Sequence, residues 1–374
     1  MMTWREGRVR ELLPGWDGVV VVSVDLDGGA IVRALAYLEL VGAPVVGDRV
    51  LLNITALERG LGTGGYALVV AIPDRPDAWP GTTPDQAAGH LVKARYTPLQ
   101  PMVLGVDDPE GEHHGTLAEA DDLDGLPVLA TDLHSALPAV LAGVRERAPR
   151  ARVAYVMTDG GALPLAWSRT VAGLRDAGWL AATITAGQAY GGDLEAVTVH
   201  TALLAARHVV GADLAVVVQG PGNLGTDTRW GFSGVAAGEA LNAAGVLGGR
   251  PVAGLRVSQA DARERHRGLS HHSATAFGRV LAHPADVPVP ATTDRLTDPL
   301  ASCLRRVREE ARALADDAPH LTVVDVDTCG LLDALRDVPV TLSTMGRGLE
   351  EDPASFLVAA VAGRHAATLV GDLG

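Results

Sequence analysis

The densest group of ionisable side chains lies at residues 262–273, in the sequence Ala-Arg-Glu-Arg-His-Arg-Gly-Leu-Ser-His-His-Ser. Imidazoles can ligate a metal ion or transfer a proton, and guanidinium groups suit a phosphate or a carboxylate. We predict that His271 or His272 acts as a general acid or base or as a metal ligand, and that Arg263 or Arg267 binds an anion. Adjacent histidines on a helix point about 100° apart, so these two alone are poorly placed to share one ion. The alternative interpretation is a solvated turn followed by a capped helix.

A glycine-rich loop between residues 219 and 233 is the second candidate region. It follows the apolar run 214–218 and precedes a helix expected from about Gly234. A short apolar strand that ends in such a loop and feeds a helix is typical of the ligand crevice of an open α/β sheet. We therefore predict that this loop forms the floor of the functional site.

The first part of this loop, 220–225, also matches the dinucleotide motif G-x-G-x-x-G. Several features disfavour a dinucleotide. Seven residues separate the last glycine from the helix, Pro221 removes a backbone donor, and no acidic residue ends the next strand at the usual distance. An NAD-type oxidoreductase is therefore the third choice of function.

Three other loops, 158–161, 191–193 and 343–348, combine glycine with small polar or acidic residues. If their strands are neighbours, these loops converge with the 219–233 loop on one crevice, where glycine lets a ligand approach the backbone. We predict Asp159 and Asp193 as catalytic groups beside the two histidines. The predicted ligand-binding residues are Gly160, Gly161, Gly192, Gly220, Gly222, Asn223, Gly225, Thr226, Asp227, Arg263 and Arg267. In the alternative interpretation these are ordinary turn and cap residues, with Asp193 capping a helix over 194–209.

The elements that must hold these residues alternate from about Leu126 onward. Short β-rich runs are separated by helical segments, which implies right-handed crossovers and a mostly parallel sheet. The predicted strands are 127–131, 152–157, 179–185, 214–218, 251–258, 321–326 and 338–343. The predicted helices end near 147 and 178 or span 194–209, 301–315 and 354–367. The pattern thus predicts a Rossmann-like, doubly wound α/β domain over residues 126–374.

Residues 1–105 predict a smaller all-β domain. Short β-rich segments are separated by Gly, Asp and Pro turns, with few helical periods between them. The predicted strands are 19–24, 29–35, 48–54 and 66–72. This pattern indicates a small β-barrel or sandwich. Residues 106–125 form an acidic stretch that we interpret as a linker between the two domains.

Composition limits the class of protein and its partners. Hydrophobic residues make up 47% of the 374, enough for a sizeable core, and no apolar run approaches the roughly 18 residues of a membrane span. The formal charge of -14 disfavours nucleic acid and anionic membranes as partners. Two cysteines provide neither a disulfide framework nor a Cys-type zinc site. We expect a cytoplasmic homo-oligomer whose partner is a small anionic ligand.

Several motifs resemble those of a known bacterial family. They are Asp132-Leu-His-Ser135, Met157-Thr-Asp-Gly-Gly-Ala-Leu-Pro164, Tyr190-Gly-Gly-Asp-Leu-Glu-Ala-Val197, Gln219-Gly-Pro-Gly-Asn-Leu-Gly-Thr226, Trp230-Gly-Phe-Ser-Gly234 and Arg263–His272. Over nearly its whole length the chain resembles a family of actinobacteria and firmicutes that carries only a domain-of-unknown-function label. The resemblance implies no activity, cofactor or catalytic residue, so the site prediction depends on the residues themselves.

These residues predict an α/β protein that binds a small anionic or nucleotide-like ligand at its glycine-rich loops. The expected reaction class is metal-assisted or general acid–base hydrolysis or group transfer. No G-x-S-x-G, Walker A or H-E-x-x-H motif occurs, which disfavours covalent catalysis and P-loop hydrolysis. The identity of any metal or cofactor stays open. The competing class is a non-catalytic assembly or sensor protein, in which the apolar helix 354–367 lies in a subunit interface.

Overall fold

A computed structural model describes residues 2–76, 89–159, 161–291 and 298–371. Its contacts divide the chain into two compact units. The first unit comprises Met1–Leu104 and Pro164–Ala172, and the second comprises Gly105–Leu163 and Gly173–Gly374. Residues 164–172 therefore belong to the first unit although the residues on both sides of them belong to the second. The two units cannot be separated by cutting the chain at one position.

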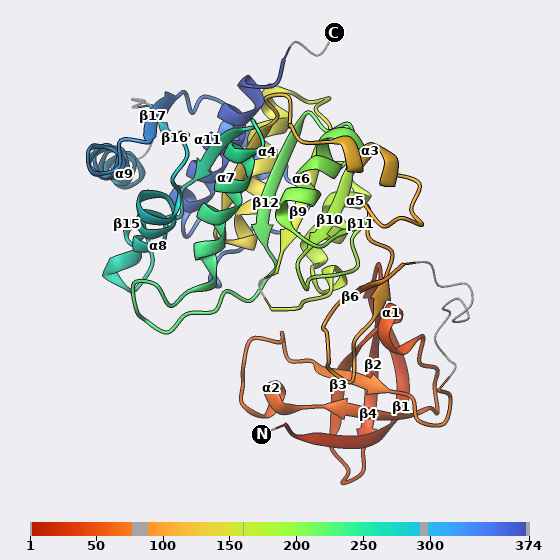
Figure 1. The fold of residues 1–374 in the computed structure, drawn as a ribbon. Coiled ribbons are helices and arrows are strands. Elements are labelled where there is room, and N and C mark those ends of the chain that lie inside the picture. The colour runs from red at the N-terminus through yellow and green to blue at the C-terminus, as the bar shows by residue number, and fades with distance from the viewer. Residues whose placement is uncertain (1, 77–88, 160, 292–297, 372–374) are drawn as a thin grey trace. The chain divides into compact units, whose positions relative to one another are not determined.

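The first unit contains a closed five-stranded barrel (Figure 1), which confirms the predicted β-barrel. In the order in which they close the barrel, the strands are β1 (Trp4–Trp16), β2 (Val19–Leu26), β3 (Ile31–Tyr37), β5 (Ala67–Ala71) and β4 (Arg49–Asn53). Strands β3 and β5 pair in parallel, and the other neighbours are antiparallel. The unit also holds α1 (Leu38–Val41), α2 (Thr55–Glu58), β6 (Leu91–Val92) and β7 (Met102–Val103). Inward-facing Val, Leu and Ala side chains form the barrel core.

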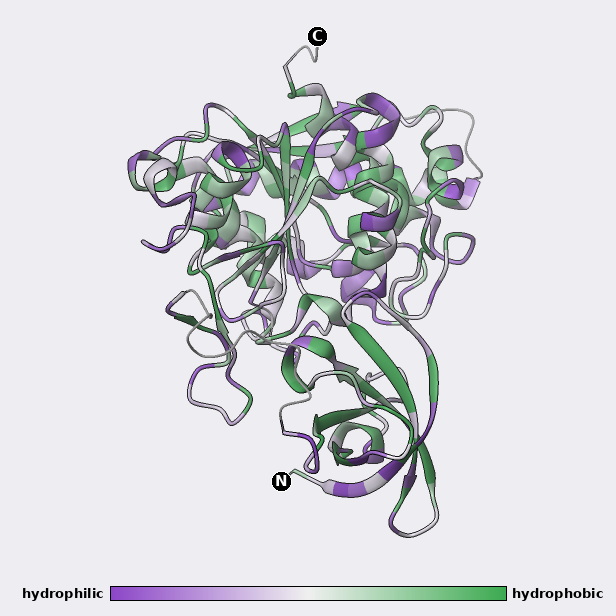
Figure 2. Ribbon diagram, turned by 90° about the vertical axis from the view of Figure 1, so that its right-hand side faces the viewer, coloured by the Kyte–Doolittle hydropathy of each residue, from purple (hydrophilic) through white to green (hydrophobic). Residues whose placement is uncertain are grey.

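The longest strand, β1, is absent from the sequence prediction. Most of its side chains are exposed, and its N-terminal end is polar (Figure 2), so it lacks the regular alternation of a half-buried strand. It forms because β2 pairs with it on one side and β4 on the other. A side chain at Gly7 would collide with the backbone oxygen of Asp25, so the close approach of β1 and β2 requires glycine there.

An apolar cluster on the outer face of the barrel is packed against residues 164–172 of the same unit. Trp16 Nε1 donates a hydrogen bond to the carbonyl oxygen of Ala166 at 2.6 Å. The Arg169 guanidinium lies 4.0 Å from the centroid of the Trp16 ring and donates to the Tyr66 hydroxyl at 2.8 Å. These cation–π and hydrogen-bond contacts hold residues 164–172 on the barrel.

The second unit is built on an eight-stranded parallel sheet, which confirms the Rossmann-like, doubly wound prediction. In spatial order its strands are β11 (Leu194–Ala196), β10 (Ala182–Ala186), β9 (Val153–Thr158), β12 (Leu214–Gln219), β8 (Pro127–Thr131), β13 (Arg250–Gly254), β16 (Ala285–Pro290) and β17 (Leu321–Val326). The central strands β8, β9 and β12 are almost entirely buried, as expected for a sheet covered on both faces. The run 214–218 is therefore a central strand of the sheet.

Helices cover both faces of this sheet (Figure 1). The helices that follow the barrel strands in the chain are α3 (His114–Glu119), α4 (Leu137–Arg147), α5 (Arg169–Asp176), α6 (Val199–His208), α7 (Ala236–Val246), α8 (His271–Thr275), α9 (Asp298–Asp317), α10 (Leu331–Arg336) and α11 (Pro353–Thr368), of which α5 begins in the first unit and ends in the second. A short hairpin pairs β14 (Val257–Ser258) with β15 (Gly268–Leu269). Of the helices in the described part of the chain, none combines the length and the apolarity that a bilayer crossing requires.

The predicted helix over 194–209 is wrong in its first turn. Residues 194–196 form β11, and α6 begins at Val199 with Thr198 as its cap. Asp193 therefore caps no helix. Its carboxylate accepts hydrogen bonds from the backbone N–H and the hydroxyl of Thr183, both at 2.8 Å, and this ties the start of β11 to β10.

One strand prediction near the end of the chain also fails, and one strand is missing from the prediction. Residues 338–343 form no strand, and Leu342 is the one buried residue of this run, so no continuous apolar face holds it in the sheet. The sequence prediction lacks β16, which contains Pro288 and Pro290, and proline is unusual inside a sheet. Its pairing with β13 is limited to the residue pair Val252–Asp286, which is compatible with the missing proline donors.

The order of the strands predicts where a ligand binds. Strand β8 continues through α4 to β9 on one side, whereas β13 continues to β16 on the other. In open α/β sheets, ligands bind outside the carboxyl ends of the strands where neighbouring connections diverge. The topology therefore points to the residues that follow β8, β12 and β13.

Helices α4 and α11 approach each other closely at Gly363. A methyl group on Gly363 would overlap the carbonyl oxygen of Val140. We expect Gly363→Ala to lower the free energy of unfolding by about 1–3 kcal/mol, because the helices must move apart. Urea denaturation followed by circular dichroism measures the change.

The control is Gly115→Ala in α3, where the added carbon would have no neighbour within 4 Å. It should be neutral or slightly stabilising, because alanine restricts the unfolded chain more than glycine does. Equal stability of the two variants would contradict the close packing of α4 and α11.

Candidate functional site

A cavity of about 320 Å³ lies among the residues that follow β8, β12 and β13. Its lining residues are Leu133, Asn223, Leu224, Gly225, Asp227, Thr228, Gly231, Arg256, Arg263, Arg265, His266, His271, His272 and Met345. All of them belong to the second unit. The position agrees with the topological expectation, since Leu133 follows β8, Asn223 follows β12 and Arg256 follows β13.

Three histidines converge at this cavity. His266 ends a short 3-10 turn, and His271 and His272 are the first residues of α8. One ring nitrogen from each lies within 4.8 Å of the others, and the ring centroids are 4.4–5.0 Å apart. Gly268, at a φ of 71°, allows the chain to turn between His266 and α8. Ser270 then caps α8 by accepting a hydrogen bond from the backbone N–H of His272.

Asp132 and Phe232 orient His272. The imidazole stacks on the Phe232 ring with a centroid separation of 3.8 Å and an interplanar angle of 7°. Its Nδ1 lies 3.3 Å from Asp132 Oδ2, which also accepts a hydrogen bond from Arg256 at 3.3 Å. Burial opposes ionisation of Asp132, but the hydrogen bond from His272 and the charge of Arg256 hold the pKa of this carboxyl below its usual range. A buried, ionised carboxylate therefore stands behind the ring.

Burial keeps His266 and His271 uncharged. It is the main cause that lowers the pKa of His266 to about 3 and that of His271 to about 4, and nearby cations contribute to both shifts, among them Arg263 at His266 and Arg265 at His271. His266 Nδ1 lies 2.7 Å from Ser270 Oγ. His271 Nε2 is buried and has no hydrogen-bond partner among the residues that the structure describes. The neutral imidazole is the form that ligates metals and accepts protons.

Each arginine of the cavity lining faces a carboxylate. The pairs are Arg256 with Asp132, Arg263 with Asp261 and Arg265 with Asp227. The hydrogen bond from Arg263 is the main cause that lowers the pKa of Asp261, so this pair is fully ionised at neutral pH. Because the charges cancel within each pair, they contribute little net charge to the cavity.

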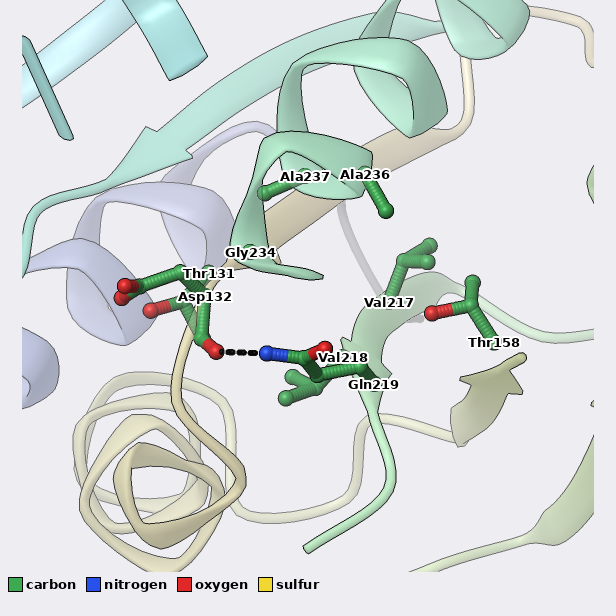
Figure 3. A pocket seen from close by; sticks show the side chains of 9 residues that line it. All are labelled: Thr131, Asp132, Thr158, Val217, Val218, Gln219, Gly234, Ala236 and Ala237. Atoms are coloured by element: carbon green, nitrogen blue, oxygen red, sulfur yellow. Dashed lines mark hydrogen bonds between the residues drawn. The ribbon is translucent and has the colours of Figure 1, made fainter. Parts of the chain in front are cut away.

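Below the cavity, the ends of β8 and β12 pack tightly against each other. Figure 3 shows Gln219 reaching toward Asp132, whose backbone oxygen accepts a hydrogen bond from Gln219 Nε2 at 2.7 Å. The space enclosed by these side chains is too small to hold a water molecule. This dry packing fixes the backbone of Asp132 and hence the place of its carboxylate.

The structure brings some of the predicted site residues to the cavity and leaves others elsewhere. Six of them line it: Asn223, Gly225, Asp227, Arg263, His271 and His272. Eight do not: Asp159, Asp193, Gly161, Gly192, Gly220, Gly222, Thr226 and Arg267. Gly160 lies outside the described residues. Asp159 accepts a hydrogen bond from the backbone of Ala162, and Asp193 pairs with Arg175, so both carboxylates serve local structure.

The sequence patterns do not single out Asp132, Arg256 or His266 as site residues. Asp132 follows the predicted strand 127–131 directly, and an acidic residue at the carboxyl end of a strand is the signal that could have selected it. His266 stands in the dense polar cluster, but linear spacing does not reveal that the chain turns back at Gly268. Arg256 carries no local signal, because its role depends on a carboxylate 124 residues away.

Asp132→Asn removes the charge that compensates Arg256, whose side chain is 8% exposed. We expect the free energy of unfolding to fall by about 3–5 kcal/mol, because the guanidinium stays buried without a counter-charge. Thermal or urea denaturation measures the loss.

The comparison variant is Arg265→Gln, which breaks a pair whose side chains are 42% and 69% exposed. Water screens this pair, so the change should be only about 0–1 kcal/mol. Losses of the same size in both variants would show that burial does not strengthen the Asp132 pair.

The comparisons with known proteins identify the family and nothing beyond it. A model of the family described as "Protein of unknown function (DUF3866)" matches residues 33–363. No curated protein and no solved structure matches the chain. The match includes every residue of the cavity lining, in agreement with the resemblance of the motifs. Since it spans nearly the full length, the chain belongs to the DUF3866 family.

Proposed function

We propose that the chain is an enzyme that hydrolyses, or transfers a group from, a small anionic or nucleotide-like substrate bound in the cavity. The observation that carries the proposal is the gathering of three imidazoles with Arg263 and Arg265 around one space of about 320 Å³. Proton-transfer and anion-binding groups must face the same substrate to act together. A space of this volume is at the small end of the usual range for small-molecule sites.

Arg263 and Arg265 retain donors for an anion although each faces an aspartate. A guanidinium has five N–H donors, and Asp261 engages only the Nε and Nη2 groups of the Arg263 side chain. Arg265 is 42% exposed, so a ligand oxygen can reach it. Both arginines lower the pKa of a neighbouring histidine, which supports a position close enough to act on the same substrate.

In hydrolysis, the attacking water must lose a proton and the leaving group must accept one. When an ionised carboxylate accepts a hydrogen bond from Nδ1 of a histidine, Nε2 is free to take a proton. Asp132 lies at Nδ1 of His272 in this way. The imidazoles act either as bases themselves or through a bound metal ion. Arg263 and Arg265 then stabilise the negative charge that develops on the substrate.

The competing functions receive less support. An assembly or sensor protein does not require histidines and arginines to share a cavity, yet His271 and His272 line the same cavity as Arg263 and Arg265. The hypothesis of a subunit interface depends on the apolar helix α11. This helix is buried within its own unit along most of its length, so its apolar residues are not evidence for a homo-oligomer. Gly220 and Gly222 of the dinucleotide motif do not line the cavity.

Ligand binding by the purified chain tests the proposal. Inorganic phosphate, nucleoside monophosphates and small dicarboxylates are screened by thermal shift and titrated by calorimetry, and esters of any class that binds are assayed for hydrolysis. The variant Arg263→Gln/Arg265→Gln should bind the same anion at least about 10-fold more weakly, because charge-assisted hydrogen bonds are worth about 1.5–3 kcal/mol each.

The matched control is Arg336→Gln on α10, where the arginine pairs with Asp333 in an exposed position outside the cavity. It should bind the anion like the parent chain. A screen without a stabilising anion, or equal affinity in the double variant, would refute anion binding at this site.

A further inference from the structure

We propose that His266, His271 and His272 together bind one divalent transition-metal ion and leave a coordination position of that ion open to the cavity. Three imidazoles favour Zn²⁺ or a related ion over Mg²⁺ and Ca²⁺, which prefer oxygen ligands. The site goes beyond the proposed reaction, because the ion can be bound whether or not the cavity turns over a substrate.

The spacing of the rings suits a single ion. One nitrogen from each histidine lies within 4.8 Å of the others. A tetrahedral Zn²⁺ with Zn–N distances of about 2.0–2.1 Å separates its ligand nitrogens by about 3.4 Å, so small side-chain rotations are enough to close the set. His271 and His272 are adjacent in α8, and the third ligand that such a pair lacks arrives from the preceding turn as His266.

The hydrogen bonds leave the right nitrogens available. His266 Nδ1 is engaged by Ser270 at 2.7 Å, so its Nε2 is the nitrogen left for an ion. His271 Nε2 is buried without a hydrogen-bond partner among the described residues. An unpaired buried polar atom is unfavourable, and coordination to a metal ion would give this nitrogen a partner.

The surroundings of His272 complete the arrangement. Asp132 Oδ2 lies 3.3 Å from its Nδ1, and a carboxylate in this position is the usual outer-shell partner of a metal-bound histidine. Arg256 Nη1 lies 3.0 Å from the same Nδ1 and can only donate. We assign the proton to Nδ1, which can donate it to the ionised Asp132, and this assignment leaves Nε2 to ligate the ion. Phe232, stacked on the ring, holds it in this plane.

A divalent ion bound here would change the net charge of the cavity. The arginine–aspartate pairs cancel, so a divalent ion would supply the excess positive charge. A zinc ion held by three histidines keeps a fourth position for water and lowers the pKa of that water to about 7. The open position would therefore present a nucleophile to an anion held at Arg263 and Arg265.

Direct measurement of metal binding tests the site without reference to activity. The chelator-treated full chain is titrated with Zn²⁺, Co²⁺ and Mg²⁺ by calorimetry, and Co²⁺ is also followed by its visible absorption, which reports the ligand geometry. We expect one Zn²⁺ or Co²⁺ per chain and no binding of Mg²⁺ at the same concentration. Absence of Zn²⁺ and Co²⁺ binding would overturn the proposal.

Substitutions then identify the ligands. His266→Gln, His271→Gln and His272→Gln should each weaken Zn²⁺ binding at least about 100-fold, and Asp132→Asn about 10–100-fold as an outer-shell partner. The control is His200→Gln on α6, an exposed histidine outside the cavity, which should bind Zn²⁺ like the parent. Circular dichroism confirms that each variant is folded. Unchanged affinity in His272→Gln would mean that Arg256 donates to Nδ1 and that the three-histidine site is wrong.

The same variants separate this proposal from the proposed function. Anion binding that persists in the chelator-treated chain and is lost in Arg263→Gln/Arg265→Gln, together with no metal binding, would overturn the metal site and keep the enzyme proposal. Stoichiometric Zn²⁺ binding that the histidine substitutions abolish, together with no anion binding, would uphold the metal site alone.

Discussion

The buried carboxylate of Asp132 is the group on which the site depends. It stands directly after the central strand β8, with its backbone fixed by Gln219 in a space too small for water. From there it accepts hydrogen bonds from Arg256, which follows β13, and from His272, the second residue of α8. A charge without solvent must be matched by partners at close range, so one carboxylate locks the relative positions of three segments. The orientation of the His272 ring at the cavity is well defined because the Asp132 carboxylate that holds it is rigid.

The cavity combines strong local charges with a small net charge. Each arginine of its lining has a carboxylate partner, and burial keeps two of the histidines neutral. Such a lining does not repel a cation, and an anion would be held by the remaining donors of Arg263 and Arg265 rather than by net charge. A bound divalent ion changes this balance, because it adds uncompensated positive charge at the point where the imidazoles converge. The proposed metal binding and the proposed anion binding should therefore support each other, as linked equilibria do.

The layered fold was predictable because its signals are local and repeated. Apolar runs such as 127–131 and 214–218 recur between helical segments, and only a parallel sheet buries such runs on both faces. Predictions failed where an element depends on distant partners. Strand β1 is polar and exists because β2 and β4 pair with it, and β16 tolerates two prolines because its pairing with β13 is short. The start of the 194–209 segment became strand β11 because Thr183 of the neighbouring strand binds Asp193.

By itself, the sequence determined the family, the fold class and the chemical types present at the site. It identified the 262–273 cluster and the 219–233 loop, since dense polar residues and glycines stand out in a largely apolar chain. Only the tertiary structure decided which of these residues meet. It brought His266, His271 and His272 together, placed Asp132 and Arg256 behind them, and left Asp159 and Asp193 to local structure. The physical reason is that a site requires side chains within a few ångströms of one another, and strand order, which linear spacing does not encode, sets those distances.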